Sequence, residues 1–190
     1  MNSHGWCDLA PFSPDHAGAS LTTVVALPVG GARRIVLREE NGVVLESEGA
    51  ADADTRRVLI AAGRRVLALD VDIAPFHETV RRDPRYRWIA ETRSGRLLRG
   101  PSAWEDVVKL VLTTNCSWAF TKKMTAALVE RYGEAARDGT RSFPTPERLA
   151  RVTEAEFREV VRAGYRSPYL VALSRAVATG DADPASWDTD

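Results

Sequence analysis

The stretch Val111-Leu112-Thr113-Thr114-Asn115-Cys116-Ser117 decides how the second half of the chain folds. An apolar stripe at helical spacing leads into it, formed by Trp104, Val107, Val108, Val111 and Leu112. The polar run Thr113–Ser117 interrupts this stripe, and a second helix is predicted from about Ser117 to Tyr132, ending at Gly133. Polar side chains at a corner between two amphipathic helices seldom serve a core, so we expect them to be presented to a partner.

Capping signals mark the ends of the predicted helices. Ser102-Ala103-Trp104-Glu105 and Thr153-Glu154-Ala155-Glu156 are capping boxes, in which the fourth residue can bond back to the first. Thr145 followed by Pro146 starts another helix, and Ser167-Pro168 starts one that closes at Gly180. The helix from Thr153 is predicted to stop at Gly164. Short connections then predict a compact helical domain with a second polar corner at Gly164-Tyr165-Arg166.

The first part of the chain has the pattern of strands. Three β-rich runs follow one another, at Leu21–Pro28, Arg33–Glu39 and Gly42–Glu48. Asn41-Gly42 is a strong hairpin signal, and Asp54–Leu69 has the periodicity of a helix that would pack on the resulting sheet. We therefore predict an α+β protein: residues 1–80 form a small domain with an antiparallel β-sheet and a packed helix, and residues 81–190 form an all-α domain.

Bulk properties exclude several classes of protein. No run approaches the ~18 apolar residues of a membrane span, and the N-terminus lacks the pattern of an export signal. The two cysteines, Cys7 and Cys116, suit neither a disulfide framework nor a zinc site. We expect a cytoplasmic protein with no membrane partner, no metal and no cofactor.

Charge is unevenly distributed although the formal net charge is zero. Residues 1–80 hold 7 basic and 11 acidic side chains, whereas residues 81–180 hold 19 basic and 11 acidic ones. The densest basic stretch is Arg81–Arg99, where seven arginines are opposed only by Asp83 and Glu91. Basic charge concentrated in one half is typical of a surface that contacts phosphates. Charge alone equally fits a set of solvated helix faces.

Several motifs, in order and spacing, resemble the helix-hairpin-helix base-excision DNA glycosylases. The chain is similar to both 8-oxoguanine DNA glycosylase and 3-methyladenine DNA glycosylase II from roughly Leu97 to Gly180. The matching strings are Arg96-Leu97-Leu98-Arg99, Trp104-Glu105, Val111–Ser117, Arg131-Tyr132-Gly133, Phe143-Pro144-Thr145-Pro146 and Gly164-Tyr165-Arg166-Ser167-Pro168-Tyr169-Leu170. The N-terminal strands and helix match the family in pattern more than in residues.

The resemblance implies DNA-binding roles for four residues at the two corners: Asn115, Ser117, Tyr165 and Arg166. Enzymes of this family extrude a damaged nucleotide from the duplex. The loop matching Thr113–Ser117 enters the minor groove, with Asn115 at the position that fills the gap. Tyr165 matches a residue that wedges beside the opposite base, and Arg166 matches an arginine that contacts that base.

The residues themselves leave other interpretations open. Asn115 could cap the helix that begins near Ser117, a frequent role for asparagine. Tyr165 could be a half-buried aromatic, and Arg166 a solvated residue near a helix end. The carboxylates Glu105 and Asp106 look like capping charges at a helix start.

The chain also departs from the family pattern. Cys116 and Ser117 stand where oxidised-guanine enzymes have further asparagines, and Phe120 stands where they have an arginine for the opposite base. The family's Leu-Pro-Gly-x-Gly hairpin, its catalytic aspartate and the lysine of bifunctional members follow the segment that matches Gly180. We find none of them before Asp190, so we nominate no catalytic residue and expect a C-terminally truncated form.

Three functions are compatible with these observations. The first is base-excision repair by a DNA N-glycosylase that removes an oxidised or alkylated base by nucleotide flipping, of which this chain would hold the DNA-wedging portion. The second is a catalytically silent module that binds DNA or senses damage. The third is a structural remnant without DNA affinity. Under the first two, the partner is double-stranded DNA containing a damaged base. We expect a monomer in the cytoplasm, associated with the nucleoid when bound.

Overall fold

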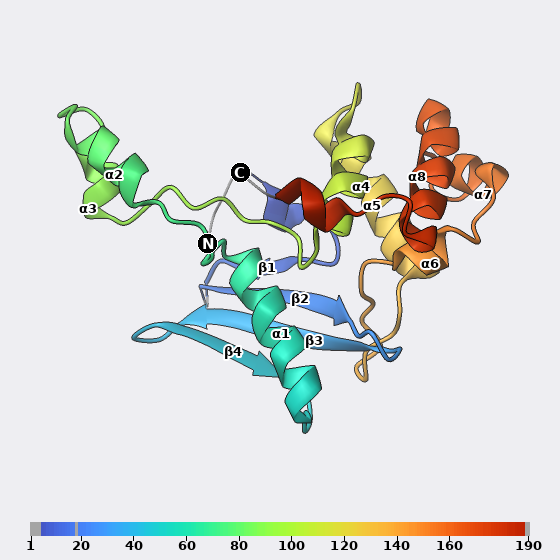
Figure 1. Cartoon of the computed structure of the whole chain (residues 1–190), viewed down its shortest axis with the longest axis horizontal. Helices are drawn as coiled ribbons and strands as arrows, with labels where there is room; N and C mark the ends of the chain where they lie inside the picture. Colours follow the sequence, from blue (N-terminus) through green and yellow to red (C-terminus); the bar gives the residue numbers. More distant parts are fainter. Residues whose placement is uncertain (1–4, 18, 189–190) are drawn as a thin grey trace.

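A computed structural model describes residues 5–17 and 19–188, in which a small sheet and a cluster of helices stand side by side (Figure 1). The sheet has four antiparallel strands in the order β1-β2-β3-β4, which confirms the predicted α+β class. Its strands are β1 (Ser13–Asp15), β2 (Ser20–Ala26), β3 (Ala32–Glu39) and β4 (Val43–Ser47). The predicted hairpin at Asn41-Gly42 is present and connects β3 to β4. Gly30 and Gly31 lie in the turn that connects β2 to β3.

The helix predicted after the strands crosses one face of the sheet. α1 (Ala53–Val66) begins at Asp52, whose side chain accepts a hydrogen bond from the Thr55 amide. Leu59, Ala62 and Val66 are buried with apolar residues of β2 and β3. This cluster also takes in Leu98, and the Arg99 amide donates to the Val66 carbonyl. The chain thus returns to the sheet beyond residue 80, and the division into two domains at that residue stays a prediction.

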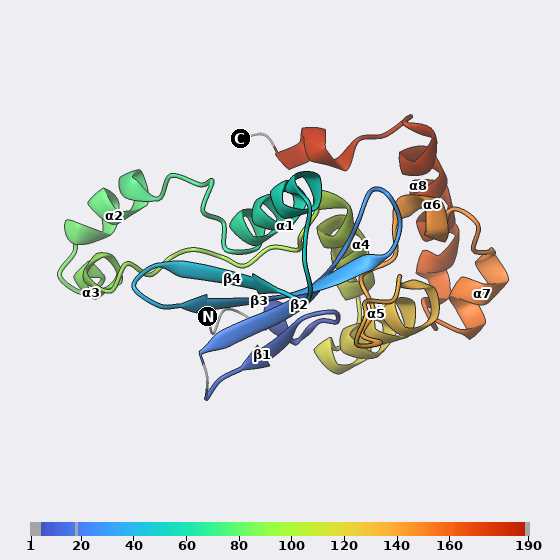
Figure 2. The same ribbon diagram turned by 90° about the horizontal axis from the view of Figure 1, so that it is seen from below.

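Two short helices between the sheet and the helical part stand away from both (Figures 1 and 2). They are α2 (Ala74–Arg81) and α3 (Arg87–Glu91). Just before α2, the Asp72 carboxylate accepts a hydrogen bond from the Ala74 amide. The second short helix, α3, has no side-chain cap at its start, and the sequence analysis did not predict it.

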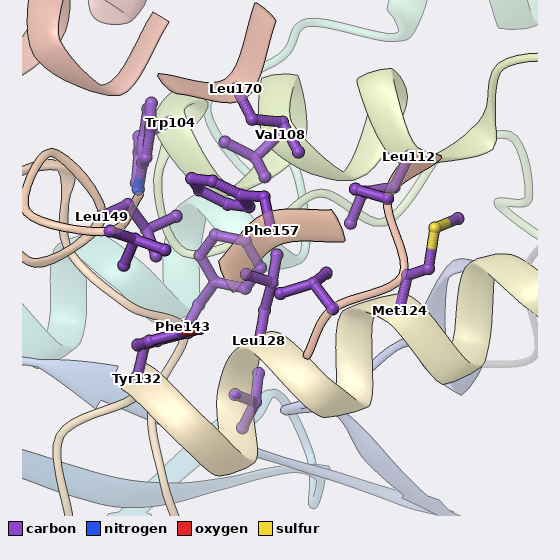
Figure 3. Close-up of a cluster of buried hydrophobic side chains, with 14 residues drawn as sticks. Trp104, Val108, Leu112, Met124, Leu128, Tyr132, Phe143, Leu149, Phe157 and Leu170 are labelled. Atoms are coloured by element: carbon purple, nitrogen blue, oxygen red, sulfur yellow. The ribbon is translucent and has the colours of Figure 1, made fainter. Parts of the chain in front are cut away.

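The remaining helices pack around one apolar cluster (Figure 3). They are α4 (Ala103–Thr113), α5 (Trp118–Tyr132), α6 (Pro146–Leu149), α7 (Glu154–Glu159) and α8 (Ser167–Thr179). The described chain also has the 3-10 turns η1 (Trp6–Asp8), η2 (Gly164–Arg166) and η3 (Pro184–Asp188), of which η1 buries Trp6 and Cys7 in the cluster of the sheet. Val108, Leu112, Leu128, Phe157 and Leu170 are fully buried in the cluster. Burial of large apolar side chains contributes roughly 1.5–3 kcal/mol each, so this cluster holds the helices at fixed angles.

Helix ends show where local signals succeed and fail. Thr145 and Thr153 are caps as predicted, and Thr153 and Glu156 form both halves of a capping box. The prediction that this helix reaches Gly164 was wrong, because α7 ends at Glu159. Arg162 has φ 64°, and the Ala163 amide bonds back to the Phe157 carbonyl, so the chain leaves the helix early. Gly180 closes α8 with φ 83°, as predicted.

Within the described residues, no helix is long and apolar enough to cross a bilayer. Among the same residues, no group of three or more His, Cys, Asp or Glu side chains is placed to hold a metal ion.

Candidate nucleic-acid interface

The corner between α4 and α5 presents Asn115 to solvent. Asn115 has φ 47°, in the left-handed region that asparagine tolerates better than most residues. The hydroxyls of Thr113 and Thr114 donate to the carbonyls of Leu110 and Val111 at 2.7 and 2.8 Å, which closes the end of α4. The corner is therefore held by its own hydrogen bonds, and the Asn115 amide projects from a defined backbone.

Ser117, and not Asn115, caps the following helix. The Ser117 hydroxyl accepts from the Phe120 amide at 3.3 Å, and α5 begins at Trp118. The alternative interpretation of Asn115 as a helix cap was therefore wrong. Cys116 is half-buried, with Sγ 3.2 Å from both the Leu112 carbonyl and the Thr121 hydroxyl, so it anchors the corner from beneath.

The second corner, η2, presents Tyr165 and buries Arg166. Gly164 has φ 60°, which lets the chain turn sharply before α8. Tyr165 is 51% exposed, whereas Arg166 is only 4% exposed. The interpretation of Arg166 as a solvated residue near a helix end was wrong. Its burial needs partners for the guanidinium, because an unpaired buried charge is costly.

Thr114, on the first corner, supplies most of those partners. Arg166 Nε donates to the Thr114 hydroxyl at 3.1 Å, and Arg166 Nη2 donates to the Thr114 carbonyl. Nη1 donates to the Ala163 carbonyl at 3.2 Å, and the guanidinium lies 4.6 Å from the centre of the Tyr165 ring. The Tyr165 hydroxyl is itself 3.1 Å from the Thr114 hydroxyl. The two corners, far apart in sequence, thus form one unit.

Exposed apolar and aromatic side chains flank this unit. Leu110, one turn before Thr113 on α4, is 54% exposed, and Tyr169, one turn after Tyr165, is 66% exposed. Aromatic and aliphatic side chains at an exposed tip suit insertion between bases, since they can replace part of the stacking that a flipped base loses. We define the paired corners as residues 113–117 and 164–166.

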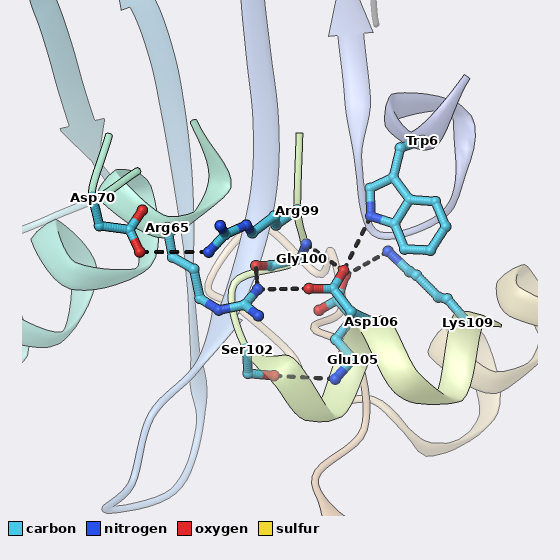
Figure 4. A network of polar contacts seen from close by, with 9 residues as sticks. All are labelled: Trp6, Arg65, Asp70, Arg99, Gly100, Ser102, Glu105, Asp106 and Lys109. Atoms are coloured by element: carbon cyan, nitrogen blue, oxygen red, sulfur yellow. Dashed lines mark hydrogen bonds and ion pairs between the residues drawn. The ribbon is translucent and has the colours of Figure 1, made fainter. Parts of the chain in front are cut away.

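The opposite end of α4 carries a polar network that the sequence did not reveal (Figure 4). Asp106 accepts from Trp6 Nε1 at 3.1 Å, from the Gly100 amide at 2.6 Å and from Arg65 at 2.6 Å. These partners lie on η1, on the segment just before α4 and on α1. Asp106 therefore joins the sheet to the helices rather than acting as a simple capping charge.

The neighbouring Glu105 is also not a capping charge. Ser102 does cap α4, accepting from the Glu105 amide, but the Glu105 carboxylate pairs instead with Lys109 at 2.5 Å. Both side chains are buried, and Lys109 Nζ lies 4.7 Å from the Phe12 ring and 5.7 Å from the Phe143 ring. Burial raises the pKa of Glu105, and the ammonium of Lys109 opposes that rise. Glu and Lys four residues apart, beside an apolar stripe, were the available signal for this pair.

The predicted site residues thus fall into two groups. The structure brings Tyr165 and Arg166 against Thr114, which directly precedes Asn115, and it gives Ser117 a capping role at the base of the same corner. Thr114, the acceptor that joins the corners, was missed, because its partner lies 52 residues away and leaves no local pattern.

Comparison with known proteins finds a similar family and similar chains. A family model described as HhH-GPD superfamily base excision DNA repair protein matches residues 108–189. DNA-3-methyladenine glycosylase of Bacillus subtilis (strain 168) is 27% identical over 117 residues, which cover 60% of this chain and 39% of that protein.

Solved structures share the fold. The 3-methyladenine DNA-glycosylase from Archaeoglobus fulgidus superposes with a TM-score of 0.68 at 17% identity, covering 86% of this chain and 57% of that one. The 8-oxoguanine glycosylase/lyase of Clostridium acetobutylicum, in complex with double-stranded DNA containing cytosine opposite 8-oxoG, gives 0.58 at 16% identity, covering 93% and 68%. The chain spans well under two thirds of the length of the Bacillus and Archaeoglobus proteins. These matches show that residues 108–189 are similar to the HhH-GPD superfamily of base excision DNA repair proteins, which is the resemblance that the sequence motifs predicted.

Proposed function

We propose that this chain binds damaged duplex DNA and contributes the duplex-opening part of a base-excision DNA glycosylase. The observation that carries this proposal is the joining of two exposed corners into one unit by the Arg166–Thr114 contacts. Further support comes from the relatives, which are named as 3-methyladenine and 8-oxoguanine glycosylases, and from the Clostridium structure, which contains double-stranded DNA.

The paired corners fit the mechanical part of base flipping. Extruding a nucleotide costs a few kcal/mol of stacking and pairing, and a side chain must fill the vacated space. In our proposal Asn115 enters that space, where its amide can bond to base edges, and Tyr165 wedges into the adjacent step. Because Arg166 already holds both corners in place, little conformational entropy is lost when DNA binds.

We assign Arg166 a positioning role in this proposal. A direct contact between its guanidinium and the opposite base would require the side chain to leave Thr114 and emerge from a site where it is 4% exposed. Holding Thr114 needs no such change. Arg166 then acts on DNA through the placement of Asn115 and Tyr165.

A second candidate function is a DNA-binding module without base release. It is favoured by the fate of the two carboxylates at the start of α4. Glu105 is committed to Lys109, and Asp106 to Arg65, Trp6 and Gly100, all at the end of α4 far from Asn115. Glycosidic bond cleavage needs a carboxylate or an amine near the reacting sugar.

The finer features of the function are also proposals. We propose that the damaged base is an oxidised guanine or an alkylated adenine, in line with the names of the relatives. We further propose that the protein acts as a monomer in the cytoplasm, associated with the nucleoid when it binds DNA.

Binding is tested with a fluorescent duplex that contains an abasic-site analogue, compared with the intact duplex by anisotropy. Asn115→Gly removes the amide but keeps the left-handed backbone without strain. Loss of one or two hydrogen bonds of ~1 kcal/mol should weaken abasic binding roughly 5- to 30-fold. Asn41→Gly is the matched control, because Asn41 is also exposed with φ 53° but lies in the β3–β4 hairpin. Equal affinities for the two variants would refute the role of Asn115.

Base release separates the two candidate functions. The chain is incubated with duplexes containing oxidised guanine or alkylated adenine, and abasic sites are detected by alkaline cleavage. We expect the chain to bind these duplexes without producing new abasic sites, because we assign no catalytic group among the described residues. Base release would establish glycosylase activity and would show that a catalytic group is present that we have not identified.

A further inference from the structure

The segment 74–93, which we call the arm, projects from the body of the protein. It consists of α2, α3 and the turns between them, and in Figure 1 it extends from the same side of the sheet as α4 and α5. Its base is tied by hydrogen bonds: the His77 ring is 2.7 Å from the Ser94 carbonyl, and Arg96 donates to the carbonyls of Ala68 and Val71. Arg96 thereby links the segment that leads into the arm with the segment that leads out of it. These hydrogen bonds fix the position of the arm relative to the rest of the protein.

Core packing does not explain the sequence of the arm. Within the described chain, α2 buries none of its side chains and α3 buries only Ala90. The two helices pack mainly on each other and on the segment that follows α3. The Phe76 ring lies so close to Gly95 that a Cβ atom built on Gly95 would be 2.6 Å from the ring. Because the arm exposes most of its side chains, the kinds of side chain that it exposes indicate which partner it can bind.

The tip of the arm gathers arginines and aromatic rings. The guanidinium groups of four exposed arginines form no hydrogen bond or ion pair with the described residues, namely those of Arg81, Arg82, Arg87 and Arg93. The remaining acidic side chains of the arm that could oppose them are Glu78 and Glu91, because Asp83 is held by a two-pronged contact with Arg85 at 2.7 and 3.1 Å. Tyr86 and Trp88 beside them are 48% and 56% exposed.

We propose that the arm is a second duplex-contacting surface, whose arginines bind the DNA phosphate backbone outside the step opened by the paired corners. This rests on the proposed function, since it assumes that the chain binds duplex DNA. Guanidinium groups match phosphate geometry with two donors each, and free ones release condensed counterions when they bind. The exposed rings can pack on sugars beside those phosphates. The arm reads no sequence and no lesion; it lengthens the bound footprint.

The test compares two double variants in anisotropy titrations with an intact duplex of about 20 bp over a series of salt concentrations. Arg81→Gln/Arg87→Gln removes two charges from the arm while keeping side-chain length and helix propensity. Arg148→Gln/Arg151→Gln is the matched control. Both arginines are exposed, and their guanidinium groups form no hydrogen bond or ion pair with the described residues. They lie in and just after α6, on the far side of the molecule from the arm (Figure 1). Circular dichroism verifies that both variants fold.

We expect the salt-dependence slope of the arm variant to fall by about 0.9 for each lost phosphate contact, which lowers affinity at ~0.1 M salt by up to about 60-fold for two contacts. The control should stay within about twofold, and the ratio of abasic to intact affinity should be unchanged in the arm variant. Equal slopes for the arm variant and the control overturn the arm proposal and leave the proposed function standing. Failure of the unmodified chain to bind any duplex at low salt overturns both.

Discussion

Removing the Lys109 ammonium should destabilise the protein strongly and in a way that depends on pH. Lys109 is fully buried beside Glu105, between the rings of Phe12 and Phe143. Lys109→Met keeps the volume and places a thioether among the aromatic rings. It leaves the Glu105 carboxylate buried without its cation. Breaking a buried pair by removing one partner costs about 3–5 kcal/mol, which corresponds to a Tm lower by roughly 6–20 °C for a chain of this size.

The pH dependence follows from the direction of the pKa shift. Burial raises the pKa of Glu105 and Lys109 lowers it, so the substitution should raise it further. A carboxyl with a raised pKa in the folded state binds more protons folded than unfolded. Its ionisation therefore costs stability as pH rises above the ordinary pKa of glutamate, near 4.5, and the cost is relieved as pH falls. The deficit of the variant should be largest near neutral pH and should shrink on acidification.

Urea unfolding followed by circular dichroism measures both effects. Adding Glu105→Gln to Lys109→Met removes the stranded charge, so the double variant should recover most of the loss and lose its pH dependence relative to the wild type. A loss below about 1 kcal/mol for Lys109→Met, unchanged between about pH 5 and about pH 8, would refute the reasoning. That outcome would mean that water reaches the pair in solution.

Three further substitutions test other parts of the structure. Arg166→Lys should lower the free energy of unfolding by about 1.5–3 kcal/mol, because an ammonium cannot reach both Thr114 and the Ala163 carbonyl. The same variant should bind the abasic duplex more weakly in anisotropy titrations. Wild-type values of both quantities would refute the positioning role. Gly133→Ala should cost about 1–3 kcal/mol or more in urea unfolding, since its Cβ would lie 2.0 Å from the Ser142 carbonyl oxygen, and a neutral result would contradict the close approach. Thr153→Ala should cost about 0.5–2 kcal/mol and lower the Tm measured by circular dichroism, because α7 loses its capping box, whereas an unchanged Tm would show that packing alone holds the helix.

Local sequence signals predicted most of the regular structure. The Asn41-Gly42 pair predicted a hairpin because its left-handed backbone is easily adopted by these two residues. Thr145, Thr153 and Gly180 marked helix ends for a similar reason: each acts on backbone groups within a few residues. The end of α7 was mispredicted because it depends on a left-handed arginine, Arg162, for which no local preference exists.

The candidate site was predictable in its members but not in its construction. The order of motifs located Asn115, Tyr165 and Arg166, and their roles toward DNA stay predictions. Only the folded chain shows that Arg166 is buried and joins the corners through Thr114. Neither residue has a local feature that distinguishes it from a surface arginine or an ordinary threonine.

By itself the sequence determined the α+β class, most of the helix and strand positions, and the resemblance of residues 108–189 to a base excision repair superfamily. These depend on periodicity, caps and motifs that act over short stretches. The tertiary structure alone decided which polar groups meet. It tied Asp106 to Trp6 and Arg65, and it coupled the two corners through Arg166 and Thr114. Such pairings depend on how the helices pack across one core, so no local pattern in the sequence predicts them.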